Sequence, residues 1–484
     1  MIDLKGQLNR YFGFKNFRPG QQQVMTALLK HRDVLAVLPT GGGKTLLYQL
    51  YAAITHQRVI IVSPLISLMQ DQVGRLQYLG SKHVVALTSG LDFKERQFVL
   101  KHLERYQFIY VSPEMLANPQ VITRLQKLAI GLLVIDEAHC ISEWGPDFRP
   151  DYLKLAGVRK TLKKPLTLMM TATATVKTRL DILRRLEMRP NQVEQVELPV
   201  NRKNIFLSAK ILSNQSDKND CLISLVNGLN GAGIIYFSSR NTAESVAAML
   251  AQKTTKRTAA YHGGMENRAR FQIQQQFMQG EIDVVCATSA FGMGIDKNNV
   301  RYVIHYHLPG NVQSYMQEIG RAGRDGKPAL AILLYEPNDR YLQANLIENT
   351  YPEDQLIAYL YNHPEKMAHN DQFRVVEFYH EAGFLVDKAS SLLHQARQRR
   401  IDELGEMTRY IFTSGCRRQF LLRCFDESLD AGSVNYQFCC DFHSDFWPRW
   451  QAFNARYLKS AASKPKKAET GWRETLQKLF LSKN

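Results

Sequence analysis

The chain has 484 residues with 45% apolar and 22% charged content, so we expect two or three soluble globular domains. Its 62 basic and 45 acidic residues give a net charge of +17, which favours a polyanionic partner such as nucleic acid over a surface that is merely solubilising. Seven cysteines in a chain of this length do not make a disulfide framework. The N-terminus has no signal-peptide pattern and no apolar run reaches membrane-spanning length, so we expect a cytoplasmic protein without a membrane partner.

A glycine-rich loop follows the first predicted strand. Residues 3–31 predict two helices around a turn at 18–20, and Asp33 to Leu38 predicts a short buried strand. Strand, glycine loop, Lys-Thr and helix form the context of a phosphate-binding loop, although Leu38 takes the first glycine position of the consensus. Lys44 can reach the β- and γ-phosphates, and Thr45 can offer its hydroxyl to Mg²⁺. The residues expected to bind the nucleotide are Thr40, Gly41, Gly42, Gly43, Lys44 and Thr45.

An acid pair ends a second buried strand, predicted at Leu132 to Ile135. At the end of this strand stand Asp136, Glu137 and His139. Ligands of doubly wound α/β folds bind at such strand ends. Within the next dozen residues come Trp144, Phe148 and Arg149. Side chains of these types stack on and clamp nucleic-acid bases, so this one segment is expected to touch both a metal–phosphate site and a polynucleotide.

Three further strands complete a first set of βα units, at Arg58–Val62, Phe108–Val111 and Leu166–Met170. The first two end in Ser-Pro, where a hydroxyl such as that of Ser63 can hold a nucleic-acid backbone or simply cap a helix. The third ends in a segment that contains Thr171 and Thr173. Five βα units in under 200 residues predict a parallel sheet.

A second set of βα units follows a polar boundary near 198–205. Its strands are predicted at Gly233–Phe237, Thr258–Tyr261, Ile282–Cys286, Val300–His305 and Ala329–Tyr335. This half has no Gly-Lys-Thr loop, but Arg321 and Arg324 lie three apart on one predicted helical face. An isolated pair of this kind is usually a solvated basic face. A phosphoryl-transfer site assembled between two lobes needs such arginines, and the complete nucleotide loop on the preceding lobe favours that role.

From residue 338 onward the pattern turns helical, and 459–469 is a small, basic linker or tail. The predicted fold class is therefore α/β, with two tandem parallel-sheet lobes followed by a mainly helical C-terminal region. The predicted domains are 1–200, which binds ATP, 201–340, 341–445 and a basic tail at 446–484.

The motifs TGGGKT, IDEAH, TATAT and QEIGRAGRDG, in this order, resemble those of superfamily-2 helicases, which have two RecA-like lobes. Four segments narrow the resemblance to the RecQ family: FRPGQ, CISEWGPDFRP, AFGMGIDKNNVRYVIHYHLP and GRAGRDG. The match covers roughly residues 5–340, and the chain resembles the short RecQ-like proteins of some bacteria. The resemblance implies an ATP- and Mg²⁺-dependent DNA helicase that moves 3′ to 5′ on single-stranded DNA in repair, recombination or replication.

The resemblance also implies roles for single residues. Arg18 and Gln21 would contact the adenine, Asp136 would hold Mg²⁺ with Thr45, and Glu137 would orient and deprotonate the attacking water. The residues that would relay the nucleotide state to DNA are His139, Thr171 and Thr173. The residues that would close the site from the second lobe are Gln317, Arg321 and Arg324. The residues that would couple DNA binding to hydrolysis are Trp144, Phe148 and Arg149. Implied partners are single-stranded, forked or branched DNA and single-strand-binding or recombination proteins, with a monomeric enzyme at the bacterial nucleoid.

Two departures from the family pattern stand out. Pro146 replaces a histidine that many relatives carry in the CISEWGPDFRP loop. That histidine is proposed to make one of the contacts that couple DNA binding to hydrolysis. The second departure lies at the zinc-binding region, whose cysteine pattern is altered. The candidate zinc ligands are Cys416, Cys439, Cys440 and His443. Adjacent cysteines rarely reach one tetrahedral Zn²⁺ without strain, so a degenerate, metal-free helical hairpin with an insertion between 351 and 392 is favoured over bound zinc.

Three alternatives to a DNA helicase can be compared with these motifs. An RNA helicase of the related box families would lack the Trp144–Phe148–Arg149 loop in this form. A nucleic-acid-binding scaffold without catalysis would be expected to lose its general base or arginines, and all of these are present. A DNA-stimulated ATPase that translocates, branch-migrates or anneals with little strand separation remains the main alternative to a helicase.

Overall fold

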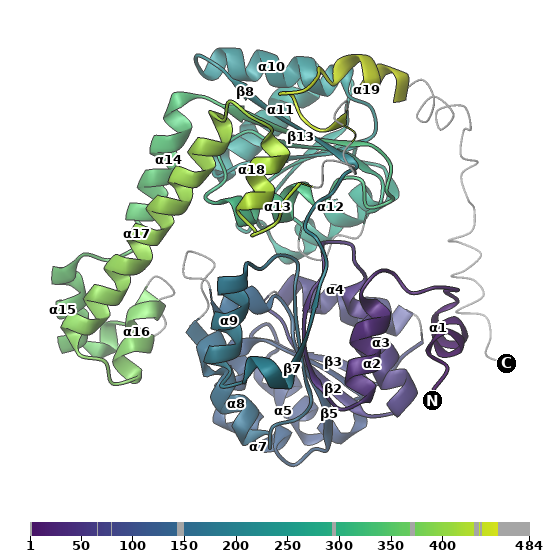
Figure 1. The fold of residues 1–484 in the computed structure, drawn as a ribbon. Helices are drawn as coiled ribbons and strands as arrows, with labels where there is room; N and C mark the ends of the chain where they lie inside the picture. The colour runs from purple at the N-terminus through teal and green to yellow at the C-terminus, as the bar shows by residue number, and fades with distance from the viewer. Residues whose placement is uncertain are drawn as a thin grey trace.

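The structure is a computed structural model that describes residues 2–64, 66–78, 80–142, 150–292, 297–367, 373–429, 435 and 438–453. Two parallel-sheet lobes are stacked one above the other, and a long helix runs along one side of both (Figure 1). Among the helices of these described ranges, none has the length and apolar content needed to cross a bilayer.

Lobe 1 is built around a seven-stranded sheet in the order β3-β4-β2-β5-β6-β1-β7, in which every neighbouring pair is parallel. Its strands are β1 (Asp33–Val37), β2 (Arg58–Val62), β3 (Val84–Leu87), β4 (Phe108–Val111), β5 (Ile130–Ile135), β6 (Thr167–Thr171) and β7 (Val193–Glu197). Its helices are α1 (Leu4–Phe12), α2 (Gln21–Leu29), α3 (Lys44–Thr55), α4 (Ile66–Tyr78), α5 (Phe93–Lys101), α6 (Pro113–Leu116), α7 (Pro119–Leu125), α8 (Leu155–Thr161) and α9 (Val176–Arg185).

Lobe 2 repeats this plan with six parallel strands in the order β10-β11-β9-β12-β13-β8. Its strands are β8 (Ile205–Ile211), β9 (Ala232–Tyr236), β10 (Thr258–Tyr261), β11 (Val284–Ala287), β12 (Val300–His305) and β13 (Ala329–Tyr335). Its helices are α10 (Gln215–Gly228), α11 (Arg240–Lys253), α12 (Asn267–Gln279), α13 (Val312–Ile319) and α14 (Pro337–Glu348).

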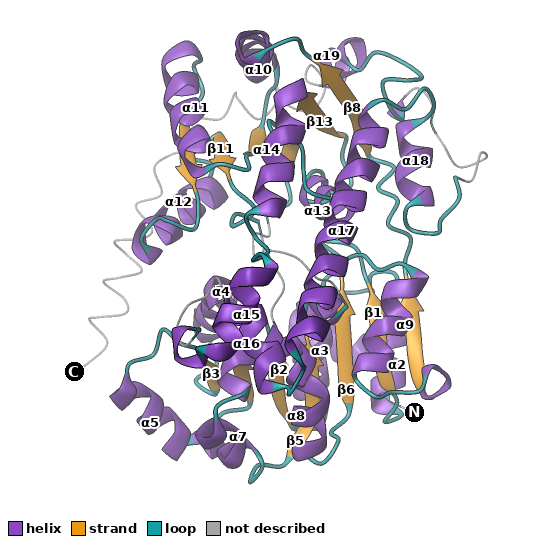
Figure 2. Cartoon of the chain, turned by 90° about the vertical axis from the view of Figure 1, so that its left-hand side faces the viewer, coloured by secondary structure: helices purple, strands orange, loops and turns teal. Residues whose placement is uncertain are grey.

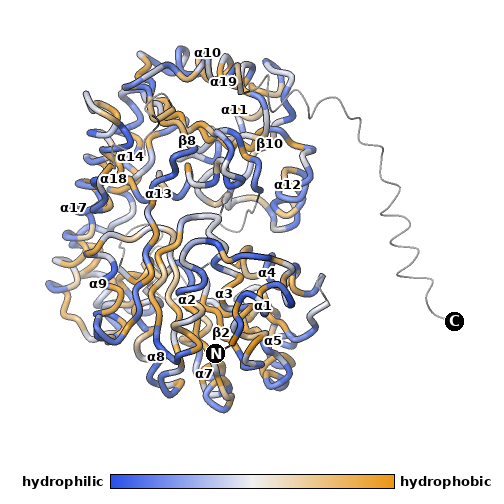
Figure 3. Tube along the Cα trace, turned by 45° about the vertical axis from the view of Figure 1, so that its right-hand side comes forward, coloured by the Kyte–Doolittle hydropathy of each residue, from blue (hydrophilic) through white to orange (hydrophobic). Residues whose placement is uncertain are grey.

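Apolar strands at the centre of each sheet account for this layering. The inner strands are continuous apolar runs, and each face of each sheet carries its own buried cluster under a layer of helices. Hydrophobic segments accordingly lie inside both lobes and hydrophilic ones outside (Figure 3). The predicted α/β class with two parallel-sheet lobes is confirmed, and parallel alignment brings the strand ends that carry the motifs to one edge of each sheet.

Three strands that the sequence analysis did not predict are β3, β7 and β8, and each is an edge strand. β7 reads VEQVE and buries only its two valines, because one side of an edge strand faces polar surroundings. β3 has four residues and a half-buried middle. β8 follows the polar linker 198–204 directly, so its apolar start was assigned to the boundary between lobes.

The C-terminal region is helical, as predicted, with α15 (Asp354–Asn362), α16 (Arg374–Glu381), α17 (Val386–Ile411), α18 (Arg417–Arg423) and α19 (Trp447–Phe453). The second half of α17 packs into the core of lobe 2 through Leu404, Met407 and Tyr410. Its first half forms a small separate core with α15 and α16, here called the helical tip. α19 falls in the stretch predicted as a basic tail, but Trp450 is fully buried against lobe 2. The remaining tail lies outside the described residues.

The helical tip reaches back to lobe 1 (Figure 2). Arg374 of α16 pairs with Asp151 at 3.1 Å and with Glu114 at 3.7 Å. Glu381, at the end of α16, pairs with Lys154 at 3.2 Å. α17 has 26 residues, about 39 Å of helix, and thereby connects the two lobes along a path separate from the linker 198–204.

Candidate active site

The phosphate loop connects β1 to α3 and is held from both sides. Gly41 and Gly43 have φ of +83° and +75°, a region in which a side chain would be strained. A Cβ on Gly43 would lie 2.5 Å from Nε2 of Gln21, and one on Gly41 would lie 3.2 Å from the side chain of Arg324. α3 begins at Lys44 without a side-chain cap, so its N-terminal amides are directed at the loop, as in anion-binding helices.

Arg18 and Gln21 support this loop in the structure. Nε2 of Gln21 donates to the carbonyl oxygens of Gly42 and Gly43 at 3.0 and 3.1 Å, while its Oε1 accepts from the amide of Arg18 at 2.9 Å. The guanidinium of Arg18 donates to the carbonyl oxygen of Gly41. Both residues, predicted to contact the adenine, therefore line the loop side of the cavity.

The acid pair stands at the end of β5. The Lys44 ammonium lies 3.7 Å from Oε1 of Glu137, and Nδ1 of His139 lies 3.3 Å from Oε2 of the same carboxylate. His139 Nδ1 also contacts Oγ1 of Thr171 at 2.9 Å. Glu137 has a φ of +48°, an uncommon value for a residue with a side chain. Backbone strain of this kind collects at functional sites.

The surroundings shift the pKa values of Asp136 and Glu137 in opposite directions. Burial and the neighbouring Glu137 raise the pKa of Asp136 to about 6, although Lys44 opposes the shift. Burial also acts to raise the pKa of Glu137, but the charges of Lys44, His139 and Arg321 outweigh it and lower that pKa. Glu137 is therefore held ionised, the form that accepts a proton from water.

Lobe 2 contributes α13 and the segment Gly320–Arg324, here called the arginine turn. Nε2 of Gln317 lies 3.5 Å from Nε2 of His139, which is a direct contact between the lobes. The Arg321 guanidinium donates to the carbonyl oxygen of Gly292 and is near enough to Glu137 to lower its pKa. The arginine turn thus faces the acid pair across a cavity of about 1090 Å³.

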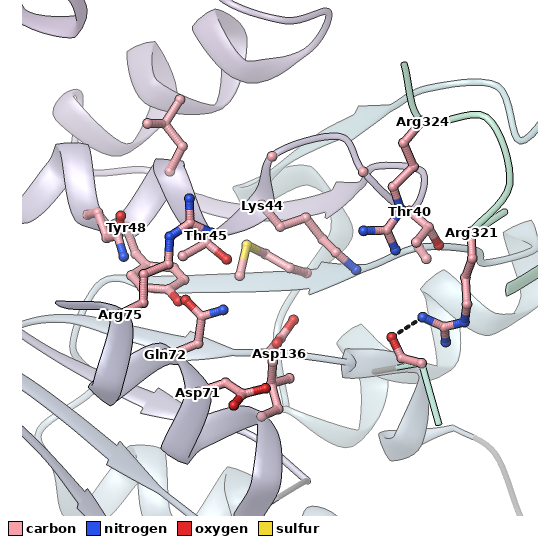
Figure 4. A pocket seen from close by; sticks show the side chains of 18 of the residues that line it. Thr40, Lys44, Thr45, Tyr48, Asp71, Gln72, Arg75, Asp136, Arg321 and Arg324 are labelled. Atoms are coloured by element: carbon pink, nitrogen blue, oxygen red, sulfur yellow. Dashed lines mark hydrogen bonds between the residues drawn. The ribbon is translucent and has the colours of Figure 1, made fainter. Parts of the chain in front are cut away.

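Side chains from both lobes point into this cavity (Figure 4). Lys44 reaches into it from lobe 1 with Asp136 below, and Arg321 and Arg324 enter from lobe 2 on the opposite side. Thr40 and Thr45 lie on the same wall as Lys44. Every residue predicted for phosphate binding and hydrolysis, except Gly42 and buried His139, lines this one cavity. These are Thr40, Gly41, Gly43, Lys44, Thr45, Asp136, Glu137, Gln317, Arg321 and Arg324.

Three residues predicted for DNA binding and coupling, Ser63, Thr171 and Thr173, do not line the cavity. Ser63, Thr171 and Thr173 are at most 5% exposed, so in this state they are inside lobe 1 behind the acid pair. Thr171 accordingly reaches the site through His139. Pro146 and the other residues of that loop predicted to bind DNA, Trp144, Phe148 and Arg149, lie outside the described residues.

One residue of the site was missed by sequence reasoning. Arg202 in the linker donates to three carbonyl oxygens of the arginine turn, at 2.8 to 3.0 Å. It stands in the polar stretch NRKN, which gives no motif signal for such a role. Only the packed structure brings it beneath the arginine turn.

The four candidate zinc ligands form a Cys/His cluster of Cys416, Cys439, Cys440 and His443. Their donor atoms lie within 4.8 Å of one another, and the three cysteines are buried. Sγ of Cys416 lies 3.6 Å from that of Cys439 and 3.8 Å from that of Cys440. The adjacent cysteines were expected to have difficulty in reaching one metal ion together. In these described residues they do not, because the chain turns at Cys439 and the thiols of Cys439 and Cys440 both face Cys416.

The cluster fits a zinc ion in chemistry and size. Sulfur ligands 2.3 Å from a tetrahedral Zn²⁺ are about 3.8 Å apart, close to the sulfur distances here. Contacts among the thiols lower the pKa of Cys416 and raise that of Cys439, so without metal the cluster favours the thiolate at Cys416. The set of three sulfurs and one imidazole is a common structural zinc site.

Comparisons with known proteins agree with this geometry. Residues 18–182 match the DEAD/DEAH box helicase family, residues 217–326 the helicase conserved C-terminal domain, and residues 375–444 the RecQ zinc-binding region. The probable ATP-dependent DNA helicase RecS of Bacillus subtilis is 43% identical over 91% of this chain and 92% of its own length. This chain belongs to the RecQ family of helicases. A second RecQ-family relative, the ATP-dependent DNA helicase RecQ of Haemophilus influenzae, is 36% identical over 90% of this chain and 63% of its own length.

Solved structures share the fold of this RecQ-family chain. Helicase Lhr of Mycobacterium smegmatis bound to ssDNA and AMP-PNP aligns with a TM-score of 0.57 at 20% identity, over 83% of this chain and 57% of that chain. Mss116p bound to ssRNA and AMP-PNP aligns with a TM-score of 0.58 at 18% identity, over 84% of this chain and 93% of that chain. At such identities the likeness concerns the fold with two RecA-like lobes.

Proposed function

We propose that this protein is an ATP-dependent DNA helicase that couples Mg-ATP hydrolysis between its lobes to 3′ to 5′ movement on single-stranded DNA. Unwinding would serve DNA repair, recombination or replication. The observation that carries the proposal is the meeting of the acid pair of lobe 1 and the arginine turn of lobe 2 in one cavity. Phosphoryl transfer needs a base, a phosphate-binding lysine and arginines on the developing charge, and this cavity gathers all three.

The chain's own residues divide the chemistry. Lys44 and the amides that begin α3 bind the phosphates of ATP, the substrate. Thr45 and Asp136 would hold Mg²⁺, which neutralises phosphate charge when it is bound. The ionised Glu137 orients a water and takes its proton, and His139 fixes that carboxylate from behind. Arg321 and Arg324 stabilise the charge that develops as the γ-phosphate leaves.

Single-stranded and forked DNA are the proposed nucleic-acid partners. The net charge of +17 supports attraction to a polyanion, and two relatives bear the names of DNA helicases. Binding through backbone phosphates predicts an affinity that falls steeply with salt. We also propose that the protein acts as a monomer alongside single-strand-binding or recombination proteins.

We further propose that the Cys/His cluster holds one structural Zn²⁺. Its support is the buried donor set and the match of residues 375–444 to the family's zinc-binding region. The ion would fix the N-terminus of α18, where Cys416 is the N-cap, to the segment that carries the other three donors.

ATP hydrolysis with and without single-stranded DNA tests the function. We expect strong stimulation by DNA, weaker stimulation by an RNA of the same sequence, and loss of turnover in Lys44→Ala. Lys253→Ala, which removes an exposed lysine of α11, is the matched control. Turnover that DNA does not accelerate would contradict the proposal, and a preference for RNA would assign the enzyme to the RNA-dependent helicases.

Forked duplexes with a 3′ or a 5′ tail test strand separation and polarity. A helicase moving 3′ to 5′ separates the 3′-tailed fork. DNA-stimulated turnover without strand separation would support translocation, branch migration or annealing instead. Comparison with a chain lacking residues 459–484 shows whether the basic tail is needed for separation.

A further inference from the structure

Arg418, on α18, ties the Cys/His cluster to the linker between the lobes. Its side chain is 5% exposed and donates to four acceptors. Its Nη1 contacts Oδ1 of Asn201 and the carbonyl oxygen of Arg202, both at 2.9 Å. Its Nη2 donates to the carbonyl oxygens of Ile205 and, at 3.2 Å, of Cys439. One guanidinium therefore spans the distance between a cluster cysteine and the chain that joins the two sheets.

Arg202 continues the connection from the linker to the arginine turn. Its guanidinium donates to the carbonyl oxygens of Gly320 and Ala322 at 3.0 Å and of Gly323 at 2.8 Å. Asn204 adds a second donor to Gly323, also at 2.8 Å. Carbonyl groups at the end of a helix have no partner within the helix, so α13 depends on donors of this kind. The linker supplies them.

The arginine turn is in contact with the phosphate loop, so its position matters for the chemistry. A Cβ on Gly320 would lie 3.4 Å from Oγ1 of Thr40, and one on Gly41 would lie 3.2 Å from Arg324. Little space separates the two segments. A displacement of the turn by about 1 Å moves both arginines relative to bound phosphate, and a misplacement of that size can cost about 10²-fold in rate.

The segment around α18 also holds the linker at its other end. Oε1 of Glu427 accepts from the amide of Val200 at 2.8 Å, and Oδ2 of Asp426 accepts from the amide of Val176 at 3.1 Å. Val176 is the first residue of α9 in lobe 1, which lies directly below α18 in Figure 2. The linker is thus fixed by Glu427 at Val200 and by Arg418 between Asn201 and Ile205.

We infer that Arg202 is a positioning residue for Arg321 and Arg324, and that Arg418 extends this support to the Cys/His cluster. The C-terminal segment would then serve ATP hydrolysis, although none of its described residues lines the cavity. This inference rests on the proposed ATPase function. Planar guanidinium groups suit the task because each presents five donors in a fixed fork, whereas a lysine ammonium presents three on a flexible stem.

Purely structural roles for the two arginines would predict something different. Loss of a buried guanidinium that only stabilises the fold would lower the melting temperature and leave the kinetics of the folded fraction unchanged. Loss of a positioning residue lowers kcat, while KM for ATP and the affinity for single-stranded DNA change little.

Steady-state kinetics at saturating oligo(dT) separate the two roles. We expect kcat to fall about 10²-fold in Arg202→Ala and about tenfold in Arg418→Ala, with KM for ATP within about threefold. Lysine at either position should restore little. Arg417→Ala is the matched control, because this neighbouring arginine donates to the C-terminal end of α17 and to Asp441 rather than to the linker. A kcat within twofold of wild type for Arg202→Ala, or an equal fall in Arg417→Ala, would overturn the inference.

A combined variant checks that Arg202 acts through Arg321. Once Arg321→Ala has removed one of the positioned side chains, adding Arg202→Ala should lower kcat by much less than it does alone, since residues that act as a unit are not additive. Fully additive losses would show that Arg202 acts elsewhere. Zinc content and melting temperature of each variant identify any protein lost to unfolding.

Hydrogen exchange tests the network without turnover. Amides in peptides covering residues 318–325 should exchange faster in Arg202→Ala and Arg418→Ala than in wild type or Arg417→Ala. The reason is that the carbonyl groups of the turn lose the hydrogen bonds that hold them in place. Unchanged exchange in Arg202→Ala would refute the positioning role. An inactive wild type with this exchange pattern would instead mean that the network exists and the proposed ATPase function is wrong.

Discussion

Nε2 of His139 lies 3.5 Å from the side-chain amide nitrogen of Gln317, which joins the end of β5 in lobe 1 to α13 in lobe 2. His139 also contacts Glu137 and Thr171, so this pair connects the base of the proposed hydrolysis to the helix that carries the arginine turn. Gln317→Ala should lower DNA-stimulated turnover about tenfold and leave DNA affinity unchanged, because it removes a contact between lobes rather than a DNA contact. Gln313→Ala, one turn earlier on α13, is the control. Equal losses in both variants would point to damage of the helix itself.

Glu137→Gln should lower kcat about 10² to 10⁴-fold, because an amide cannot accept the proton of the attacking water. ATP binding should persist, since Lys44 and the loop amides that bind the phosphates remain. Single-turnover hydrolysis together with equilibrium binding of a fluorescent ATP analogue measures the two effects separately. Glu104→Gln, at an exposed carboxylate, should behave as wild type. Wild-type turnover in Glu137→Gln would remove Glu137 from the role of base.

Lys218 and Asp339 form a buried ion pair in lobe 2, with Nζ at 2.6 and 2.7 Å from the two carboxylate oxygens and side-chain exposures of 0% and 2%. Burial raises the pKa of Asp339 and lowers that of Lys218, so each charge depends on the other. Asp339→Ala should destabilise the fold by about 3 to 5 kcal/mol, because it leaves a buried ammonium unpaired. Denaturant unfolding measures this loss. The double variant Lys218→Met/Asp339→Leu should regain much of it, and a double variant as unstable as the single one would contradict the explanation.

His307 should make stability depend on pH. Burial and then the charge of Lys218 lower its pKa to about 3, and its Nδ1 accepts a hydrogen bond from the amide of Ser238 at 3.0 Å. Below about pH 6.5 the unfolded chain binds a proton that the folded imidazole does not, so stability falls with pH by up to about 1.4 kcal/mol per unit. Denaturation of His307→Asn between pH 7 and 5 should show a smaller slope, by up to one proton. A slope identical to that of wild type would mean that His307 is not the titrating group.

Zinc at the Cys/His cluster should appear as about one equivalent per chain in elemental analysis of the purified protein. Its removal by a strong chelator, or the loss of one ligand in Cys440→Ser, should lower the melting temperature, because metal binding to the folded state is part of the folding free energy. Cys221→Ser, at a half-buried cysteine of α10 outside the cluster, should keep both zinc and stability. Absence of zinc from a protein purified without chelators would rule out this site.

Local pattern was sufficient to predict the inner strands of both sheets and many of the polar residues that meet in the cavity. β2 and β4 were predicted with their observed limits, since a strand buried on both faces is a continuous apolar run. The edge strands β3, β7 and β8 were missed because edge positions do not require such a run. Glycine, lysine, acid and arginine motifs are likewise local, which is why the cavity residues that belong to these motifs could be named in advance, whereas Asp71, Gln72 and Arg75, which also line the cavity, were not named.

Contacts between distant segments could not be predicted. Arg202 and Arg418 carry no motif, and the contacts that join them to the arginine turn and to the linker are with residues more than 100 positions away. The adjacent cysteines at 439 and 440 suggested strain, yet the chain turn that brings both to Cys416 depends on packing against β8. The hydrogen bonds that Gln21 donates to carbonyl oxygens of the phosphate loop were also not predicted, while its predicted contact with adenine stays a prediction.

The helical tip contacts lobe 1 through charged side chains, so this contact depends on the ionic strength of the solution. The pairs of Arg374 with Asp151 and of Glu381 with Lys154 are partly open to solvent, with Arg374 and Lys154 more than a third exposed. Salt screens such pairs, whereas the packing of α17 on lobe 2 is apolar and tolerates salt. Raising ionic strength would therefore release the tip from lobe 1 while α17 stays attached to lobe 2. Salt would then affect the enzyme in two ways. It would weaken binding to the DNA backbone, and it would let lobe 1 move relative to lobe 2.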